Sequence, residues 1–239
     1  MALFHKKRMF QLGNRLTACA SFVRPGCKLV DIGTDHAYLP IFLVKNNQIE
    51  RAIASDIRIG PLQKAAMHVK KYGVEDLVQT RLSDGLEVIF ENEADDILIA
   101  GMGGELIAKI IEAADWLRNP EKHLILQPMT TAEDLRRSLK REGFTVLEEK
   151  AAIEDGKVYS VMLAVYDPLH PNTDPLFPYI GLVDASSEEG KAYIEKQIRL
   201  FQNKVDGLTR AGREESAEPY KALICKLQDR IIQTGRNHE

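Results

Sequence analysis

Short apolar runs alternate with longer amphipathic segments from residue 28 to about residue 127. The apolar runs have the length of strands, and we expect strands at residues 28–33, 51–57, 78–84, 95–101 and 123–128. The segments between them favour helices, at residues 37–47, 59–73, 86–92 and 104–118. Pro61 suits a first helical turn and Gly73 a helix stop. This alternation predicts an α/β fold with a parallel sheet and helices on both faces.

The pattern changes after a further helical segment at residues 131–143. Two β-rich runs follow, at residues 144–153 and 157–167, and the sequence EDG separates them. Asp-Gly tolerates positive φ and is typical of a hairpin turn. We therefore expect five parallel strands followed by an antiparallel hairpin, which makes seven strands. By fold analogy alone, this topology favours methyltransferases over dehydrogenases.

Four prolines between Pro168 and Pro178 predict a boundary that is neither helix nor central strand. Beyond it, two segments, 186–212 and 215–235, carry apolar residues three and four positions apart. These apolar residues are Ile194, Ile198, Phe201, Val205 and Leu208 in the first segment and Tyr220, Leu223, Leu227 and Ile231 in the second. The spacing predicts an antiparallel helical hairpin with a structural role. We expect two domains, residues 1–167 and residues 168–239.

The composition is that of an ordinary globular protein, with 44% hydrophobic and 28% charged residues and a net charge of −3. No run approaches 18 apolar residues and no signal peptide is recognised, so we expect a cytoplasmic protein with no membrane contact. We also expect a monomer. Three cysteines, Cys19, Cys27 and Cys225, lack metal or disulfide spacing, and we expect buried thiols. We assign no metal.

Residues 1–30 contain only basic charges, which include Lys6, Lys7, Arg8 and Arg15. One interpretation is a soluble basic tail. The other is a patch that contacts phosphate groups.

Polar residues follow the first expected strand in the sequence VDIGTDHAYLP. In an open parallel sheet, ligands bind beyond the carboxyl ends of the strands. Gly33 would let a ligand approach the backbone closely, and Asp31 and Asp35 bring carboxylates that suit a cation or a hydroxyl group. Asp35 equally suits a cap on the next helix.

Acidic residues also end the second and third strands. Asp56 lies where a carboxylate accepts both hydroxyl groups of an adenosine ribose. Asp84, before Gly85, is placed to receive the exocyclic amine of adenine. Each acid alone suits an ordinary turn or cap, but three at successive strand ends predict a site for adenosine with a positive charge, namely S-adenosylmethionine.

The fourth strand leads into IAGMGGELI, whose glycines also suit a dinucleotide-binding loop. The following strand ends in Gln127 and Pro128, without an acid to hold a ribose. We therefore expect the GMGG turn to form the floor of a pocket for a flat group next to the methyl donor. The amide of Gln127 suits pairing with a base edge, or else the residue only ends the strand.

The segments NRLTACASFV, DIGTDHAYLP, IASDI, IAGMGGELI, LILQP and GKVYSVMLAVYD resemble the bacterial tRNA (adenine-22-N1)-methyltransferase family over roughly residues 10–166. The resemblance implies a Rossmann-like class I methyltransferase fold, S-adenosylmethionine as donor with S-adenosylhomocysteine as product, and adenine 22 of tRNA as acceptor. The family's motif usually continues QPN, whereas Met129 stands here. The complete expected donor site comprises Asp31, Gly33, Asp35, His36, Asp56, Ile57, Ser83, Asp84, Gly85 and Gly101.

Methyl transfer to this acceptor needs no general base, because the ring nitrogen already offers a lone pair. We expect catalysis by alignment and by stabilisation of the developing cation. The expected catalytic residues are Asp35, Tyr38, Gly101, Met102, Gln127 and Pro128. The expected tRNA contacts are Lys6, Lys7, Arg8 and Arg15. The alternatives are a methyltransferase for another RNA or a small molecule, and a non-catalytic nucleotide-binding regulator.

Overall fold

The computed structural model describes residues 10–236. In that part of the chain seven strands form one sheet in the order β3-β2-β1-β4-β5-β7-β6. The strands are β1 (Lys28–Ile32), β2 (Arg51–Asp56), β3 (Val78–Leu82), β4 (Asp96–Gly103), β5 (His123–Thr130), β6 (Phe144–Glu154) and β7 (Lys157–Tyr166). All the expected strands are present. The chain divides into two compact units, one ending at Leu98 and one beginning at Ile99, and β4 runs across this division.

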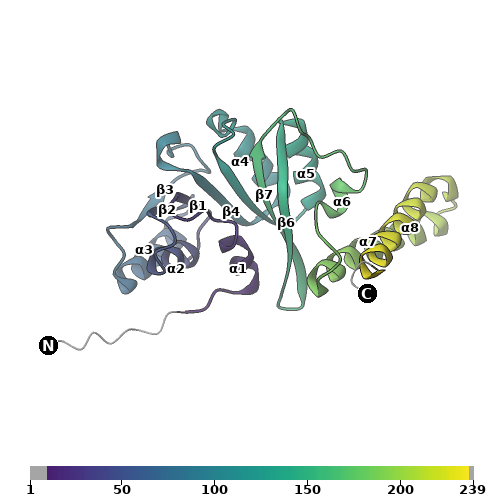
Figure 1. The fold of residues 1–239 in the computed structure, drawn as a ribbon, viewed down its shortest axis with the longest axis horizontal. Coiled ribbons are helices and arrows are strands. Elements are labelled where there is room, and N and C mark those ends of the chain that lie inside the picture. Colours follow the sequence, from purple (N-terminus) through teal and green to yellow (C-terminus); the bar gives the residue numbers. More distant parts are fainter. Residues whose placement is uncertain (1–9, 237–239) are drawn as a thin grey trace. The chain divides into compact units, whose positions relative to one another are not determined.

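The first unit holds β1, β2 and β3, the first three strands of the alternating pattern, which pair in parallel as predicted (Figure 1). In the parallel register Val30 pairs with Ile53, and Ala54 pairs with Thr80. The helices are α1 (Asn14–Ala20), α2 (Tyr38–Lys45) and α3 (Ile59–Tyr72). Leu29 to Ile32 of β1 are all buried, which is the burial of a strand covered on both faces.

In this unit one local prediction, the helix stop at Gly73, is confirmed, and another, the helix at 86–92, is not. Gly73 ends α3 in the left-handed conformation, at φ +63°, as predicted. The helix predicted at 86–92 is wrong: turns follow Gly85, which has a φ of +52°, and only a 3₁₀ turn, η1 (Glu91–Glu93), forms. Of its apolar residues Leu86 and Ile89 are buried, but Val88 and Phe90 are exposed, so little apolar burial supports a helix beside that glycine turn.

The second unit contains the predicted hairpin. Strands β6 and β7 pair in antiparallel fashion, and β7 also pairs with β5. Asp155 and Gly156 at the tip have φ values of +51° and +71°, which is the conformation that the Asp-Gly pair predicts. The expected helix at 104–118 divides into α4 (Gly104–Glu112) and a 3₁₀ turn, η2 (Asp115–Leu117), and α5 (Ala132–Arg141) follows β5.

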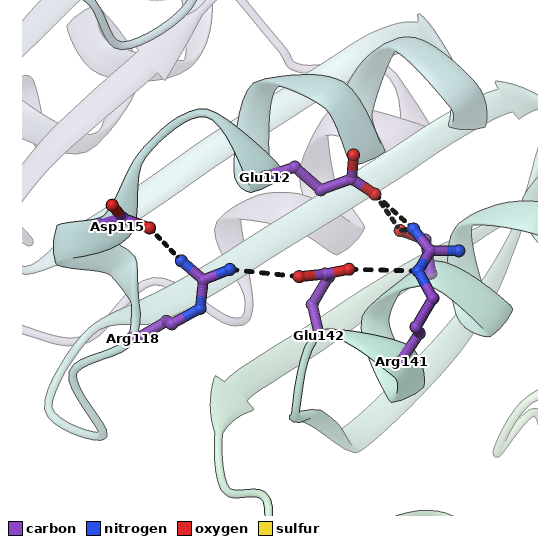
Figure 2. A network of polar contacts seen from close by, with 6 residues as sticks. Glu112, Asp115, Arg118, Arg141 and Glu142 are labelled. Carbon is purple, nitrogen blue, oxygen red and sulfur yellow. Dashed lines mark hydrogen bonds and ion pairs between the residues drawn. The ribbon is translucent and has the colours of Figure 1, made fainter.

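A chain of ion pairs joins α4, η2 and the end of α5 (Figure 2). Arg118 pairs with Asp115 and, at 3.1 Å, with Glu142. Arg141 reaches Glu142 through Nε at 3.1 Å and Glu112 through Nη2 at 2.5 Å. Both arginines are partly exposed, so each pair contributes at most about 1 kcal/mol. These ion pairs orient the short helices more than they stabilise them.

A buried ion pair ties α5 to the hairpin. Arg136 is fully buried and donates to Glu149 through Nη2 at 2.5 Å and Nε at 3.3 Å. It also donates to the carbonyl oxygens of Pro178 and Tyr179 and, at 2.9 Å, to the hydroxyl of Tyr193. Such a dense set of partners is what a buried guanidinium requires.

The C-terminal part forms the predicted helical hairpin from α7 (Glu188–Arg210) and α8 (Glu214–Arg236), which lie side by side in Figure 1. Every apolar residue that predicted the hairpin lies in one apolar cluster, buried or partly buried. Tyr193 of α7 also packs with Val158 of β7. The helix-free boundary is wrong at its end, because Pro178 lies in a one-turn helix, α6 (Phe177–Ile180), where a first-turn proline loses no hydrogen bond.

The cysteine prediction holds only in part. Cys19 and Cys27 are buried thiols, whereas Cys225 is exposed. Cys225 follows the buried Ile224 on α8, and one residue further turns the side chain about 100° away from α7. Among the described helices, none is long and apolar enough to cross a bilayer.

Candidate active site

The turn after β1 places a buried carboxylate beside an open backbone. Asp31 is only 7% exposed, and burial raises its pKa to about 6, with the charge of Asp56 adding to the rise and a hydrogen bond from Thr34 opposing it. Gly33 has a φ of +78°, which glycine adopts without strain. Gly33 and Thr34 both donate their backbone N–H to the carbonyl of Ser55, at 2.8 and 2.9 Å. The turn is thereby fixed to the end of β2.

Asp35 does not cap the following helix. The residue before α2 is Ala37, whose N–H is received by the Thr34 hydroxyl at 3.0 Å. The Asp35 carboxylate is mostly exposed and contacts His36 Nε2 at 2.9 Å and Lys64 Nζ at 3.9 Å. Of its two equal interpretations, the cap is wrong, and the ligand interpretation stays a prediction.

His36 takes part in an aromatic stack that the sequence reasoning missed. Its ring stacks on Tyr38 at 5.0 Å and on His68 at 5.1 Å between ring centroids. Phe10 packs on Tyr38 at 4.9 Å, and His36 Nδ1 is a buried atom without a hydrogen-bond partner in the described part of the chain. Lys64, His68 and Tyr72 recur every fourth residue, a helical spacing that would have placed them on one face of α3.

Asp56 is fixed at the end of β2. It is 5% exposed, and its Oδ1 accepts a hydrogen bond from the backbone N–H of Arg58 at 2.7 Å. Its charge contributes to the raised pKa of Asp31, so the two carboxylates act on one another at neighbouring strand ends. Ile57, the next residue, is exposed.

The end of β3 continues the same edge. Ser83 is buried, and its N–H donates to the carbonyl of Asp56 at 3.1 Å, while its hydroxyl donates to the carbonyl of Gly85 at 2.9 Å. Asp84 is exposed at the tip of this turn. The first unit thus brings the carboxyl ends of three strands together, with acids at each, as the strand-end argument predicts.

In the second unit, the side-chain amide of Gln127 is held by internal hydrogen bonds. Gln127 is fully buried, its Oε1 accepts from the Gly101 N–H at 3.1 Å, and its Nε2 donates to the carbonyl of Pro128 at 2.9 Å. Gly101 has a φ of +79°. These contacts make Gln127 a residue that positions the GMGG turn. The pairing of its amide with a base edge stays a prediction, and one that would compete with these internal bonds.

The glycines that follow allow close backbone packing. A Cβ on Gly104 would lie 2.3 Å from the carbonyl oxygen of Thr131, which no side chain tolerates. Met102 is half-buried and Met129 is exposed. The cluster therefore serves the packing of α4 against the β5–α5 turn, a role that needs no phosphate.

The predicted RNA contacts are only partly described. Arg15 lies on α1 and is half-buried. Lys6, Lys7 and Arg8 lie outside the described residues.

Comparisons with known proteins bear on this arrangement. Residues 12–162 match the family model described as a methyltransferase domain. The chain is also 34% identical to the tRNA (adenine(22)-N(1))-methyltransferase of Bacillus subtilis (strain 168) over 224 residues, 92% of this chain and 94% of that protein. The chain belongs to the tRNA (adenine(22)-N(1))-methyltransferase family. The resemblance seen in the sequence motifs is confirmed.

Solved structures of the family share the fold. The crystal structure of the Bacillus subtilis m1A22 tRNA methyltransferase is 33% identical with a TM-score of 0.76, and the match covers 95% of this chain and 98% of that one. A Streptococcus pneumoniae protein crystallised in complex with S-adenosyl-L-methionine is 34% identical with a TM-score of 0.78, covering 91% and 99%. The predicted Rossmann-like methyltransferase fold with its C-terminal hairpin is confirmed.

Proposed function

We propose that this chain transfers a methyl group from S-adenosylmethionine to ring nitrogen 1 of adenine 22 in tRNA. The observation that carries the proposal is the 34% identity, over 92% of the chain, to a Bacillus subtilis enzyme of that name. The S-adenosylmethionine complex of the Streptococcus pneumoniae relative supports the choice of donor.

The first unit fits such a donor chemically. Asp56 is held rigidly at the end of β2, where it can accept hydroxyl groups of a ribose. Asp31 is a buried carboxylate whose pKa is raised to about 6, and a neighbouring cation would stabilise its ionised form. Gly33 leaves the backbone open, and His36 Nδ1 is a buried polar atom in want of a partner. When bound, S-adenosylmethionine supplies a methyl group on a positively charged sulfur.

The chain's own residues act by positioning. Asp35 offers an exposed carboxylate that can stabilise the positive charge that develops on the methylated base. Tyr38 is part of the aromatic stack and presents a ring against which a flat group can pack. In the second unit, Gln127 accepts a hydrogen bond from the Gly101 N–H and so fixes the backbone at Gly101 and Met102. We assign the carbonyl groups of these two residues to contact with the acceptor adenine.

The acceptor nitrogen lies on the Watson–Crick edge, so the adenine must leave its base pair before it reacts. We assign phosphate contacts to Lys6, Lys7, Arg8 and Arg15. Reversing the charges of the first three should weaken tRNA binding and flatten its dependence on salt. An unchanged salt slope would reduce that segment to a tail. We further propose that the chain acts as a cytoplasmic monomer, with its methyltransferase domain in residues 1–167 and a helical appendage in residues 168–239.

Mass spectrometry tests the function. Unmodified tRNA is incubated with the protein and S-adenosylmethionine, digested and sequenced for methylated adenine. We expect one methyl group, at nitrogen 1 of adenine 22. Methylation at another position or in another RNA would favour the broader methyltransferase alternative. Donor binding without methylation of any tRNA would favour the non-catalytic regulator.

A further inference from the structure

A pocket of about 310 Å³ lies entirely within the second unit. None of the residues assigned to the donor lines it. One wall is the turn from Pro128 to Thr131, directly after Gln127. The other walls come from the start of α5 and from β7, α6 and α7, and they include Tyr159, Tyr179 and Lys196. The volume is at the small end of ligand pockets and suits one nucleotide better than a helical stem.

Tyr159 offers an unused aromatic surface in this pocket. It is half-buried on β7, where its backbone pairs with β6, and its side chain makes no hydrogen bond or ring contact with another residue in the range 10–236. Tyr179, by contrast, already has Arg137 over its ring at 5.5 Å and Phe201 at its edge. A base that enters the pocket therefore finds one free ring on which to stack. Every nucleobase has such a face, so stacking alone selects no sequence.

Lys196 places a cation in the same pocket as that ring. Its Nζ donates to the carbonyl of Val158, the neighbour of Tyr159, at 3.0 Å, and within residues 10–236 it has no ion-pair partner. Burial lowers the pKa of Lys196, as expected for an ammonium group that lacks a counter-charge. The carboxylate at the pocket, Glu133, is engaged by Arg137 at 2.8 Å. The free charge of the pocket is thus positive.

The pocket is held in shape by the buried ion pair. Arg136 binds Glu149 on β6, the carbonyl groups of α6 and the Tyr193 hydroxyl on α7. Each of these elements carries part of the pocket wall or its support. A ligand would therefore bind without having to order the walls first, which lowers the entropic cost of binding.

We propose that this pocket binds an unstacked nucleotide of the substrate tRNA, one other than the methylated adenosine, with its base on Tyr159 and its phosphate at Lys196. The proposal rests on the proposed function. The methylated adenine is a cation, and a pocket whose free charge is a desolvated ammonium disfavours it. The same ammonium group favours the phosphate of a neighbouring nucleotide.

The test uses the full chain, an unmodified tRNA transcript with adenine at position 22, and equilibrium binding at several salt concentrations. Tyr159→Ala should weaken tRNA binding by about 5- to 150-fold, whereas Tyr159→Phe keeps the ring and should stay within about twofold of the wild type. Lys196→Gln should reduce the slope of log affinity against log salt by about one, and Lys196→Arg should retain it. Lys191→Gln is the matched control, an exposed lysine of α7 outside the pocket, and should leave the slope unchanged.

Donor affinity, measured on the same variants, should not change, and a melting curve for each variant checks that it is folded. Wild-type tRNA affinity and salt slope in Tyr159→Ala and Lys196→Gln would overturn the inference, even if the wild type methylates adenine 22. An equal effect of Lys191→Gln, or a parallel loss of donor affinity, would also overturn it. A wild type that binds tRNA without methylating it would contradict the proposed function. The tRNA affinities of the pocket and control variants would still test the pocket.

Discussion

Replacing Asp56 with asparagine tests the donor site most selectively. Asn keeps an oxygen that can accept the Arg58 N–H, the 2.7 Å contact that fixes the turn after β2. It removes the negative charge and one acceptor for a ribose hydroxyl. The fold should therefore survive, and the loss should appear in donor binding.

The magnitude follows from the burial of the carboxylate. Asp56 is 5% exposed, so water replaces little of what the substitution removes. A lost hydrogen bond to a buried charged group costs about 1–3 kcal/mol. We expect S-adenosylmethionine to bind about 5- to 150-fold more weakly.

Calorimetric titration measures this loss of affinity. Titration with the product S-adenosylhomocysteine separates a lost ribose contact from a lost attraction to the positive sulfur. The ribose is common to both molecules, while only the donor carries a positive sulfur. Asp56→Asn should therefore weaken both to the same extent. Asp76→Asn, an exposed acid before β3, is the control and should leave both affinities unchanged. Unaltered affinity in Asp56→Asn would refute the ribose assignment, and a loss confined to the donor would show that Asp56 acts on the cation instead.

Three further predictions concern stability and are measured by urea unfolding. Arg136→Leu leaves a buried carboxylate without its partner and should cost about 3–5 kcal/mol, against at most about 1 kcal/mol for Arg141→Leu, an exposed arginine of the same helix. Equal losses would show that burial does not strengthen the pair. Asp31 has a pKa of about 6, above its unfolded value of 3.8, so the native state binds the extra proton. The wild type should therefore lose about 2–3 kcal/mol relative to Asp31→Asn as the pH rises from 4 to 7, and a difference independent of pH would contradict this. Gly104→Ala should cost about 1–3 kcal/mol because its Cβ meets backbone, whereas Gly60→Ala, with open space around it, should not destabilise. A neutral Gly104→Ala would show that the turn can yield.

The sequence predicted the parts of the fold that depend on local pattern. Each buried strand is a short apolar run, and the Asp155-Gly156 turn follows from the conformations those residues tolerate. The helical hairpin follows from the three-and-four spacing of its apolar residues, all of which lie in its core. At 86–92 the pattern failed because Val88 and Phe90 are exposed, so packing supplies little of the apolar burial that stabilises a short helix.

The site was predictable only to the level of strand ends. Acids at three successive strand ends follow from topology, because parallel strands end at one edge of a sheet. The inward-facing amide of Gln127 does not follow, since its partner Gly101 is 26 residues away along the chain. Asp35 illustrates the same limit. The cap and ligand interpretations were equal from the sequence, but α2 begins at Tyr38 without a side-chain cap, and Asp35 is exposed.

A pair of transcripts that differ at a single nucleotide shows whether the chain methylates one defined atom. The wild-type protein is incubated with S-adenosylmethionine labelled in its methyl group and with tRNA bearing adenine or guanine at position 22. We expect incorporation close to one methyl group per molecule for the adenine transcript and none for the guanine transcript. Equal incorporation into both, or none into either, would contradict this expectation.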